Sequence, residues 1–305
     1  MMNGSLTESA VLAEGLVKSY GKVKALGGVS LDVRHGETFG IIGPDGAGKS
    51  TLFRLLTSLL VPDNGSAQVE GLDTVKDYRE IRKIIGYMPG KFSLYQDLTV
   101  EENLTFFATL FGTTIDENYH LIEDIYKQIE PFKARMAGKL SGGMKQKLAL
   151  CCALIHKPKV LFLDEPTTGV DPVSRKEFWD MLGRLKNDGI TILVSTPYMD
   201  EAGRCDRIAL IRNGKFLTVN SPAGIIAEFP DRLYSVRSDR MHALLGDLRA
   251  YSGTIRAFSF GESVHLSTGD GFCEDDLRKF LQDRKHNNVE INAIRSSVED
   301  CFMRI

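Results

Sequence analysis

The sequence predicts an α/β domain with a largely parallel sheet, followed by a smaller α+β domain. Strand-like and helix-like segments alternate to about residue 226, which is the pattern of parallel strands joined by crossover helices. The composition changes after residues 229–230, and the remaining segments follow the β-α-β-β-α-β order of a ferredoxin-like domain. We therefore expect one domain over residues 1–228 and a second over residues 229–305.

The expected elements of the first domain begin with three strands, at residues 10–18, 29–33 and 38–42, with a turn at 20–22 between the first two. A helix follows the third strand. Between about residues 90 and 157 the apolar residues recur with helical spacing, which predicts a helical insertion with helices over 101–111, 118–129 and 141–155. Strand character returns at residues 160–163, 191–195 and 207–211.

In the second domain we expect a strand at 233–236, a helix at 241–251 and a hairpin across Gly261. A helix at 274–284 and a strand at 289–294 complete this domain.

A phosphate-loop pattern, G-x-x-x-x-G-K-S, lies between an expected strand and an expected helix. Its glycines let successive backbone N–H groups point at one anion, to which the helix adds its positive end. Lys49 is expected to reach the β- and γ-phosphates, and Ser50 to complete a Mg²⁺ shell. The pattern predicts a P-loop NTPase. Its nucleotide-binding residues are Gly43, Pro44, Asp45, Gly46, Ala47, Gly48, Lys49, Ser50 and Thr51.

Two carboxylates, Asp164 and Glu165, end the buried strand at 160–163. At the carboxyl end of such a strand Asp164 is expected to bind Mg²⁺ as a Walker B acid. Glu165 is then placed to orient and polarise an attacking water. Neighbouring side chains on a strand point opposite ways, so we expect Pro166 to take the chain out of the sheet here. Two exposed turn acids would be the alternative.

The motif Leu-Ser-Gly-Gly-Met at 140–144 opens another expected helix. Ser141 is expected to cap this helix, while Gly142 and Gly143 leave N–H groups bare at its positive end. Taken alone, the motif indicates a simple helix cap. Because the phosphate loop of the chain already holds a nucleotide, we expect this second anion site to address a γ-phosphate bound by another subunit.

The bulk composition disfavours several classes of protein. A formal net charge of −2 argues against a nucleic-acid partner, which calls for a basic surface. No segment approaches the roughly 18 consecutive apolar residues of a membrane helix, so a membrane role requires a partner. The five cysteines include no C-x-x-C pair, which favours a reducing cytosol over a disulfide or metal role.

Together these motifs resemble an ATP-binding subunit of an ABC transporter. The phosphate loop, residues 140–144, residues 163–166 and residues 169–172 occur in the order and spacing of that family, over about residues 9–226. The resemblance implies a head-to-tail dimer, with ATP between the phosphate loop of one subunit and residues 140–144 of the other. It also implies that Asp171 crosses the dimer interface and that Tyr20 stacks on adenine, although a lone turn tyrosine is otherwise a surface aromatic. Residues 195–202 and the short C-terminal extension are similar to the drug- and antibiotic-export branch.

Two positions depart from the family pattern. Where the family has a glutamine that touches Mg²⁺ and the attacking water, this chain has Gly90. Where the family has a histidine at the γ-phosphate, it has Pro197, which offers neither a side-chain donor nor a backbone N–H. Loss of one such contact typically costs about 10²–10³ in turnover, so ATP binding should survive better than hydrolysis. Gln96 could substitute, the chain could pair with a different ATPase, or the change could be neutral.

The leading hypothesis is an ATP-hydrolysing subunit of a membrane exporter, with Glu165 and Lys49 as catalytic residues and ATP and Mg²⁺ as cofactors. Its expected partners are separate transmembrane permease subunits and, as a homodimer or heterodimer, a second ABC ATPase. The expected location is the cytoplasmic face of the cell membrane. One alternative is a slow regulatory ATP-binding partner, which Gly90 and Pro197 favour. The other is a soluble ABC ATPase acting on ribosomes or DNA, which the single ATP-binding domain disfavours.

Overall fold

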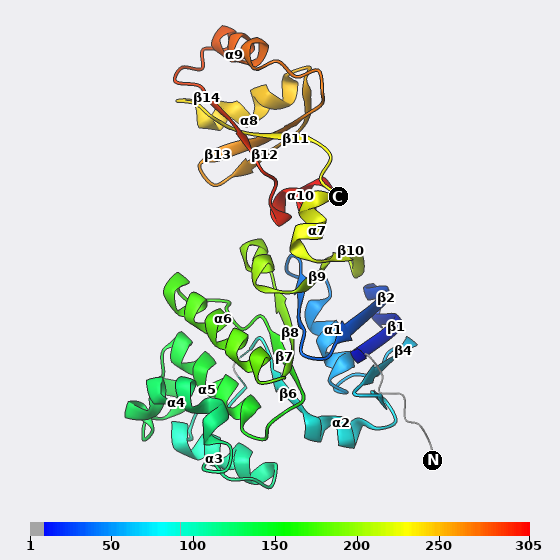
Figure 1. Ribbon diagram of the computed structural model, residues 1–305, viewed down its shortest axis with the longest axis vertical. Coiled ribbons are helices and arrows are strands. Elements are labelled where there is room, and N and C mark those ends of the chain that lie inside the picture. Colours follow the sequence, from blue (N-terminus) through cyan, green and yellow to red (C-terminus); the bar gives the residue numbers. More distant parts are fainter. Residues whose placement is uncertain (1–8, 92) are drawn as a thin grey trace. The chain divides into compact units, whose positions relative to one another are not determined.

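The computed structural model describes residues 9–91 and 93–305 (Figure 1). It divides into two compact units, the first ending at Ser221 and the second beginning at Pro222. The sequence suggested a boundary after residue 228. The division comes earlier because α7 (Pro222–Ala227) packs against α10 (Val298–Arg304), where the Cys301 thiol lies 3.5 Å from the Ile225 carbonyl oxygen. Within the described residues, no helix has the length and apolar character needed to cross a membrane.

A six-stranded sheet with the order β10-β9-β3-β8-β7-β6 forms the centre of the first unit. Five of its strands are parallel and β10 is antiparallel to β9, which confirms the expected α/β fold. Every residue of β3, β7 and β8 is buried, as their continuous apolar runs predict. Because β3, β7 and β8 are parallel, their carboxyl ends meet at one edge of the sheet. The strands are β3 (Thr38–Ile42), β6 (Ile85–Met88), β7 (Val160–Asp164), β8 (Thr191–Thr196), β9 (Arg207–Arg212) and β10 (Lys215–Asn220).

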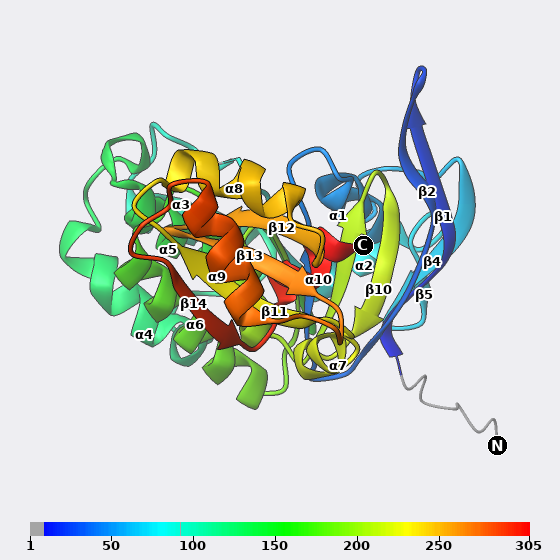
Figure 2. The same cartoon turned by 90° about the horizontal axis from the view of Figure 1, so that it is seen from above.

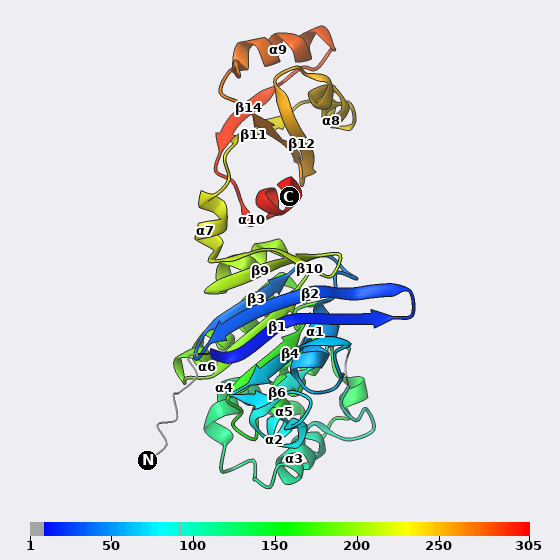
Figure 3. The ribbon, with the colours of Figure 1, turned by 90° about the vertical axis from the view of Figure 1, so that its right-hand side faces the viewer.

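A second sheet, β2-β1-β4-β5, covers helix α1 (Lys49–Leu56). The apolar side chains of α1 share one buried core with residues of both sheets, and Phe53 meets Phe162 of β7 edge-on at a centroid distance of 5.7 Å. The β1–β2 hairpin extends beyond the rest of its sheet (Figures 2 and 3). The strands are β1 (Ser9–Tyr20), β2 (Val23–Arg34), β4 (Asn64–Val69) and β5 (Leu72–Asp73).

Strand β2 is longer than the expected strand at 29–33, because the glycine pair at 27–28 bends the strand without ending it. Gly28 takes a φ of 96° and forms a bulge opposite β1. The Gly27 N–H donates to the Gly214 carbonyl oxygen at 2.7 Å, so the bulged segment keeps a backbone partner.

The helical insertion lies between β6 and β7, as expected. It contains α3 (Val100–Leu110), α4 (Tyr119–Ile129) and α5 (Gly142–Leu154), and α5 packs against both α3 and α4. Thr99 and Glu102 form a capping box that fixes the start of α3. Outside the insertion, α2 (Tyr78–Ile84) precedes β6, while α6 (Pro172–Asn187) and the short helix η3 (Met199–Arg204) flank β8 in sequence. Two further short helices, η1 (Glu130–Phe132) and η2 (Ala137–Lys139), connect α4 to α5.

The second unit has the element order β11-α8-β12-β13-α9-β14, followed by α10. Its sheet has the antiparallel order β12-β13-β11-β14. Helices α8 and α9 build a core on one face, and α10 lies on the other, where the His265 imidazole is 2.6 Å from the Asp300 carboxylate (Figure 1). The bounds are β11 (Arg232–Arg237), α8 (Met241–Ala250), β12 (Thr254–Phe260), β13 (Ser263–Thr268), α9 (Glu274–Asp283) and β14 (Glu290–Ile294).

Candidate functional site

The phosphate loop connects β3 to α1 and is shaped so that side chains cannot enter it at two positions. A Cβ on Gly43 would lie 2.1 Å from the Ile211 carbonyl oxygen, and one on Gly48 would lie 2.5 Å from the Ala25 carbonyl oxygen. Gly48 also has a φ of 107°, which L side chains rarely adopt. Because the first turn of α1 contains no acidic residue, its positive end is left for an anion. The loop therefore fits a phosphate chain.

Lys49 is buried at the start of α1 and faces both the loop and Glu165. Its amine donates to the carbonyl oxygens of Gly43 at 2.8 Å and Pro44 at 3.1 Å. It also lies 3.1 Å from Glu165 Oε1, whereas the exposed Asp45 carboxylate is 3.9 Å away. The amine can thus serve a ligand in the loop from a position beside the expected general base.

The two carboxylates at the end of β7 face different surroundings, as their different expected roles require. Asp164 is 3% exposed, and its Oδ1 accepts a hydrogen bond from Ser195 Oγ at 2.5 Å. The backbone N–H of Glu165 donates to Ser195 Oγ and to the Ser195 carbonyl oxygen. Glu165 has a φ of 52°, so the chain leaves the sheet at Glu165 itself and not, as expected, through Pro166.

Ser195 is a residue of this site that none of the sequence motifs contains. It lies on β8, is fully buried and orients Asp164 through its hydroxyl while holding the Glu165 backbone. Its register opposite Asp164 in the β7–β8 pair brings it to the site. A polar residue near the end of an otherwise apolar strand is the signal that could have revealed it.

Gly90 and Pro197 both border this centre. A Cβ on Gly90 would lie 3.0 Å from the Asp164 carbonyl oxygen and 3.8 Å from Asp164 Oδ2. Pro197 directly follows β8, and the preceding Thr196 carbonyl oxygen accepts the Gly43 N–H of the phosphate loop at 3.2 Å. Gly90 thus lies beside Asp164, and Pro197 follows a residue that is hydrogen-bonded to the phosphate loop.

Gln96 does not reach this place in the structure. Its carbonyl oxygen accepts the Gly138 N–H at 2.9 Å, and a Cβ on Gly138 would lie 3.6 Å from Gln96 Oε1. The Gln96 side chain therefore lies against the helical insertion, which argues against its replacing the missing glutamine.

A second group of expected site residues lies at the starts of α5 and α6. Ser141 caps α5 through the Met144 N–H at 3.4 Å, and a Cβ on Gly142 would lie 3.8 Å from the Gly169 carbonyl oxygen. Asp171 caps α6 by accepting the N–H groups of residues 173 and 174. These hydrogen bonds hold the pKa of Asp171 below its usual range. Across residues 9–91 and 93–305, no hydrogen bond or ion pair joins this group, which includes Gly143, to the phosphate loop.

Tyr20 lies at the tip of the β1–β2 hairpin and is 46% exposed. The same hairpin reaches the phosphate loop through Ala25, whose carbonyl oxygen faces Gly48. Because Tyr20 is exposed on this hairpin, its ring is available for stacking on a base.

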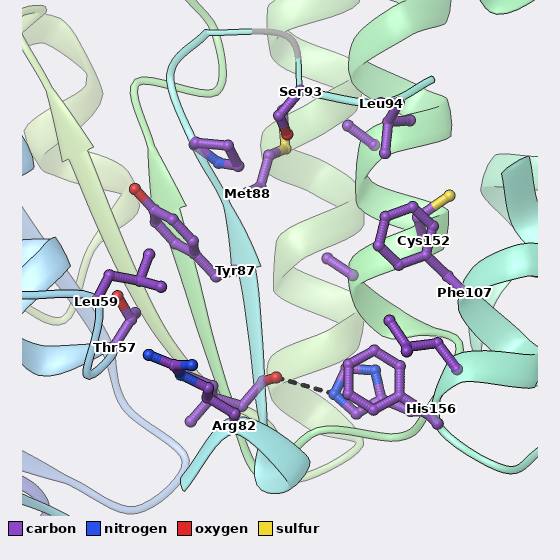
Figure 4. Close-up of a pocket in the computed structure, with 16 residues that line it drawn as sticks. Thr57, Leu59, Arg82, Tyr87, Met88, Ser93, Leu94, Phe107, Cys152 and His156 are labelled. Carbon is purple, nitrogen blue, oxygen red and sulfur yellow. Dashed lines mark hydrogen bonds between the residues drawn. The ribbon is translucent and has the colours of Figure 1, made fainter. Parts of the chain in front are cut away.

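A cavity of about 360 Å³, which we call the groove, lies beside the site, between β6 and helices α3 and α5 (Figure 4). Its walls are mostly apolar and include Met88, Leu94 and Phe107. His156 lies at one end of this groove, where it stacks on Phe111 at a centroid distance of 3.8 Å. His156 Nε2 is 2.9 Å from the Ile85 carbonyl oxygen, a contact that the neutral ring makes as an Nε2–H donor.

Burial lowers the pKa of His156 below 6.5, although the hydrogen bond to Ile85 opposes this effect. The unfolded chain therefore binds a proton more readily, and this residue destabilises the fold as the pH falls below about 6.5. In urea unfolding between pH 7.5 and 5.5, the wild type should lose more stability than His156→Gln, by up to about 1.4 kcal/mol per pH unit. Identical pH dependence in the two proteins would show that His156 is not buried as a neutral group.

Comparison with known proteins assigns this site to a family. The family model described as ABC transporter matches residues 26–168. The chain is 42% identical to the probable multidrug ABC transporter ATP-binding protein YbhF of Escherichia coli (strain K12), over 98% of this chain but only 52% of that protein. It is 34% identical to the Nod factor export ATP-binding protein I of Rhizobium sp. (strain N33), over 98% of each. The daunorubicin resistance ATP-binding protein DrrA2 of Streptomyces coeruleorubidus is 35% identical, over 97% of this chain and 94% of that protein.

Solved structures of ATP-binding subunits and cassettes also match this chain. An ATP-binding subunit of an ABC transporter matches with a TM-score of 0.67 at 28% identity, over 72% of this chain and 93% of that chain. A dimeric post-hydrolysis state of the ATP-binding cassette MJ0796, bound to ADP and Pi, matches with a TM-score of 0.63 at 26% identity, over 69% and 98%. The relatives' names agree with the expected export-like branch. The chain belongs to the ABC transporter family and contains its ATPase domain.

Proposed function

We propose that this chain binds Mg²⁺-ATP and hydrolyses it to drive a membrane exporter. The observation that carries the proposal is the convergence of Lys49, Asp164 and Glu165 on one phosphate loop. Ser50 and Asp164 would hold Mg²⁺, which neutralises phosphate charge when bound. Lys49 would bind the terminal phosphates, and the Glu165 carboxylate would accept a proton from the attacking water.

We further propose that ATP binding closes a dimer around the nucleotide. Ser141, Gly142 and Asp171 are exposed and adjacent in the chain's fold, at the positive ends of two helices. Such N–H groups favour an anion, and here they would complete the phosphate site of a second ATPase subunit. Tyr20 would stack on adenine. Either an identical chain or a related ATPase could supply the second subunit.

The groove is the surface that we propose for a separate membrane subunit. Exposed apolar side chains rim it on both sides, with Leu59 51% exposed and Leu110 63% exposed. Tyr95 and Phe106 form an edge-on aromatic pair that continues this surface along α3. Contiguous exposed apolar groups of this kind mark protein interfaces, and an amphipathic helix would bury them. Docking there would place the chain on the cytoplasmic face of the cell membrane.

Leu110→Glu tests this docking. A charge on the rim would be buried without a partner on docking, so we expect recovery of co-expressed membrane subunits to fall about ten-fold or more. Ile255→Glu is the matched control, because Ile255 is also an exposed apolar residue (50%) but lies in the second unit. Equal recovery of the membrane subunits with both variants would refute docking in the groove.

The second candidate function is a slow regulatory ATP-binding partner within a heterodimer. Gly90 and Pro197 favour it, since both border Asp164 or the phosphate loop without offering a side-chain hydrogen bond. In this form the chain would hold ATP and clamp the dimer while its companion turns over.

Pro197→His separates the two roles. A histidine would restore a donor beside Gly43, and one such contact is worth about 10²–10³ in turnover, so we expect a clear rise in the hydrolysis rate with little change in ATP affinity. Pro197→Ala is the control, because it frees the backbone without adding the imidazole. If both variants hydrolyse ATP at the wild-type rate, the proline is not what limits turnover.

A further inference from the structure

The segment after β8, which contains Pro197, is fixed by hydrogen bonds on both sides of the proline. Thr196 is the last residue of β8 and is 1% exposed, and its hydroxyl oxygen accepts the Tyr198 N–H at 3.1 Å. The same hydroxyl donates to Glu201 Oε2 at 2.5 Å. The Thr196 carbonyl oxygen accepts the Gly43 N–H at 3.2 Å, which joins the segment to the phosphate loop. A displacement of Thr196 would therefore also move the start of the phosphate loop.

Glu201 places a carboxylate in the interior of the first unit. It lies on the short helix η3 and is 3% exposed. Thr196 satisfies its Oε2 atom, but Oε1 has no hydrogen-bond partner among the residues that the structure describes. Because a buried polar atom without a partner costs free energy, Oε1 calls for a group that it can contact.

The side chain of Arg175, on α6, faces this oxygen. Arg175 Nε lies 3.7 Å from Glu201 Oε1, and in the described part of the chain it too is buried without a hydrogen-bond partner. The guanidinium carbon lies 4.1 Å from the centroid of the Tyr198 ring, a cation–π contact that orients the group. The two charges thus form an ion pair that is longer than the roughly 2.7–3.2 Å of a hydrogen bond. A small approach of α6 to η3 would complete the bond.

Arg175 also connects this ion pair to the group proposed to meet a second subunit. Its N–H donates to the Asp171 carbonyl oxygen at 2.9 Å, one helical turn earlier. Asp171 caps α6 and is exposed. Because a helix moves as a rigid element, a displacement at Asp171 would be carried to Arg175.

We propose that Glu201 is a positioning residue, which joins the Asp171 end of α6 to the segment beside the phosphate loop. This inference rests on the proposed hydrolysis of ATP within a dimer. Contact of the second subunit with Asp171 would bring Arg175 onto Glu201 Oε1. Glu201 would then hold Thr196, and with it the segment that contains Pro197, against the phosphate loop. Since Pro197 has no side-chain donor, this segment would act on hydrolysis through the position of its backbone.

Glu201→Gln tests the inference, because the amide keeps the size of the side chain and an acceptor for Thr196 but removes the charge that faces Arg175. In the purified chain loaded with Mg²⁺-ATP, we expect bound ATP to convert to ADP about 2- to 30-fold more slowly than in the wild type, the span typical of residues that couple two sites. The affinity for a fluorescent ATP analogue should stay as in the wild type. A loss of rate without a loss of affinity identifies an interaction that is used in hydrolysis and not in binding.

Glu37→Gln is the matched control. Glu37 is also buried, at 6% exposure, and pairs with an arginine, its Oε2 lying 3.4 Å from Arg207 Nη1. It directly precedes β3, however, whereas the phosphate loop follows the other end of that strand. Glu37→Gln should lower stability in urea unfolding, as Glu201→Gln does, yet convert bound ATP at the wild-type rate. An equal loss of rate in both variants would show that it follows from reduced stability, and would overturn the inference.

Arg175→Met should slow the conversion as well. The double variant with Glu201→Gln should be no slower than the slower single variant, because the two side chains act as a unit. Losses that multiply in the double variant, a wild-type rate in Glu201→Gln, or a parallel loss of ATP affinity would each overturn the role of Glu201. A wild-type chain that binds ATP without converting it would instead refute the proposed hydrolysis, and the inference would fall with it.

Discussion

Glu165→Gln is expected to lower the rate of ATP hydrolysis by about 10²–10⁴-fold, the usual contribution of a general base. The amide has the size of the carboxylate but cannot take a proton from the attacking water. Glu165 is positioned through its backbone, by Ser195, and this contact survives the change. ATP binding should therefore persist, and a stable ATP-bound dimer should accumulate. Phosphate release under saturating Mg²⁺-ATP and size-exclusion chromatography with light scattering measure the two effects.

Glu80→Gln controls for the loss of a negative charge, since Glu80 is an exposed residue of α2 paired with Lys83 at 2.9 Å. It should hydrolyse ATP at the wild-type rate. Equal hydrolysis by wild type and Glu165→Gln would contradict the assignment of Glu165 as the base.

Gly43→Ala is expected to have the second largest effect, on both stability and ATP binding. The added Cβ would meet the Ile211 carbonyl oxygen at 2.1 Å, and neither backbone can yield without disturbing β9 or the phosphate loop. Overpacking of this kind costs about 1–3 kcal/mol or more in the free energy of unfolding. Because the loop itself must shift, ATP affinity should fall as well. Urea unfolding and titration with a fluorescent nucleotide measure the two losses.

The control is Gly183→Ala. Gly183 lies inside α6, where a Cβ would have no atom within 4 Å, so this change should leave ATP affinity unaltered and stabilise the helix by up to about 1 kcal/mol. Wild-type stability in Gly43→Ala would mean that the close approach between Gly43 and Ile211 is not a feature of the fold.

The sequence predicts the strand–loop–helix form of residues 38–56 and the buried strand that ends at Asp164, because both are local patterns. The glycine spacing around Lys49 and the carboxylates at the end of β7 are short patterns, and each lies on an element with a strong apolar run. The β-α-β-β-α-β order of the second unit follows from similar runs, whereas β6, α6 and β10 of the first unit were not among the expected elements. A single sequence was sufficient for these features.

What the sequence does not predict depends on contacts between distant segments. Ser195 reaches Asp164 only because β8 pairs with β7, and Tyr87 reaches the groove only because the helical insertion folds beside β6. The position of Gln96 against Gly138 likewise arises from packing of the insertion. Spacing along the chain carries no signal for any of these contacts.

The unit boundary and the strand β2 illustrate the same limit. Local composition favours a break at residues 229–230, but the packing of α7 on α10 moves the division to Ser221. Glycine at position 28 disfavours a strand by its propensity. The pairing of β2 with β1 nevertheless continues before and after it, and Gly28 forms a bulge. Tertiary structure overrides propensity at both places.

We propose that the site binds ATP and hydrolyses it through Glu165, at a rate held down by Gly90 and Pro197. The most direct test is to incubate the purified chain with Mg²⁺-ATP, isolate it rapidly and identify the bound nucleotide over time. We expect bound ATP to decay slowly to ADP in the wild type, faster in Pro197→His, and not measurably in Glu165→Gln. Recovery of no nucleotide, or decay at the same rate in all three proteins, would contradict it.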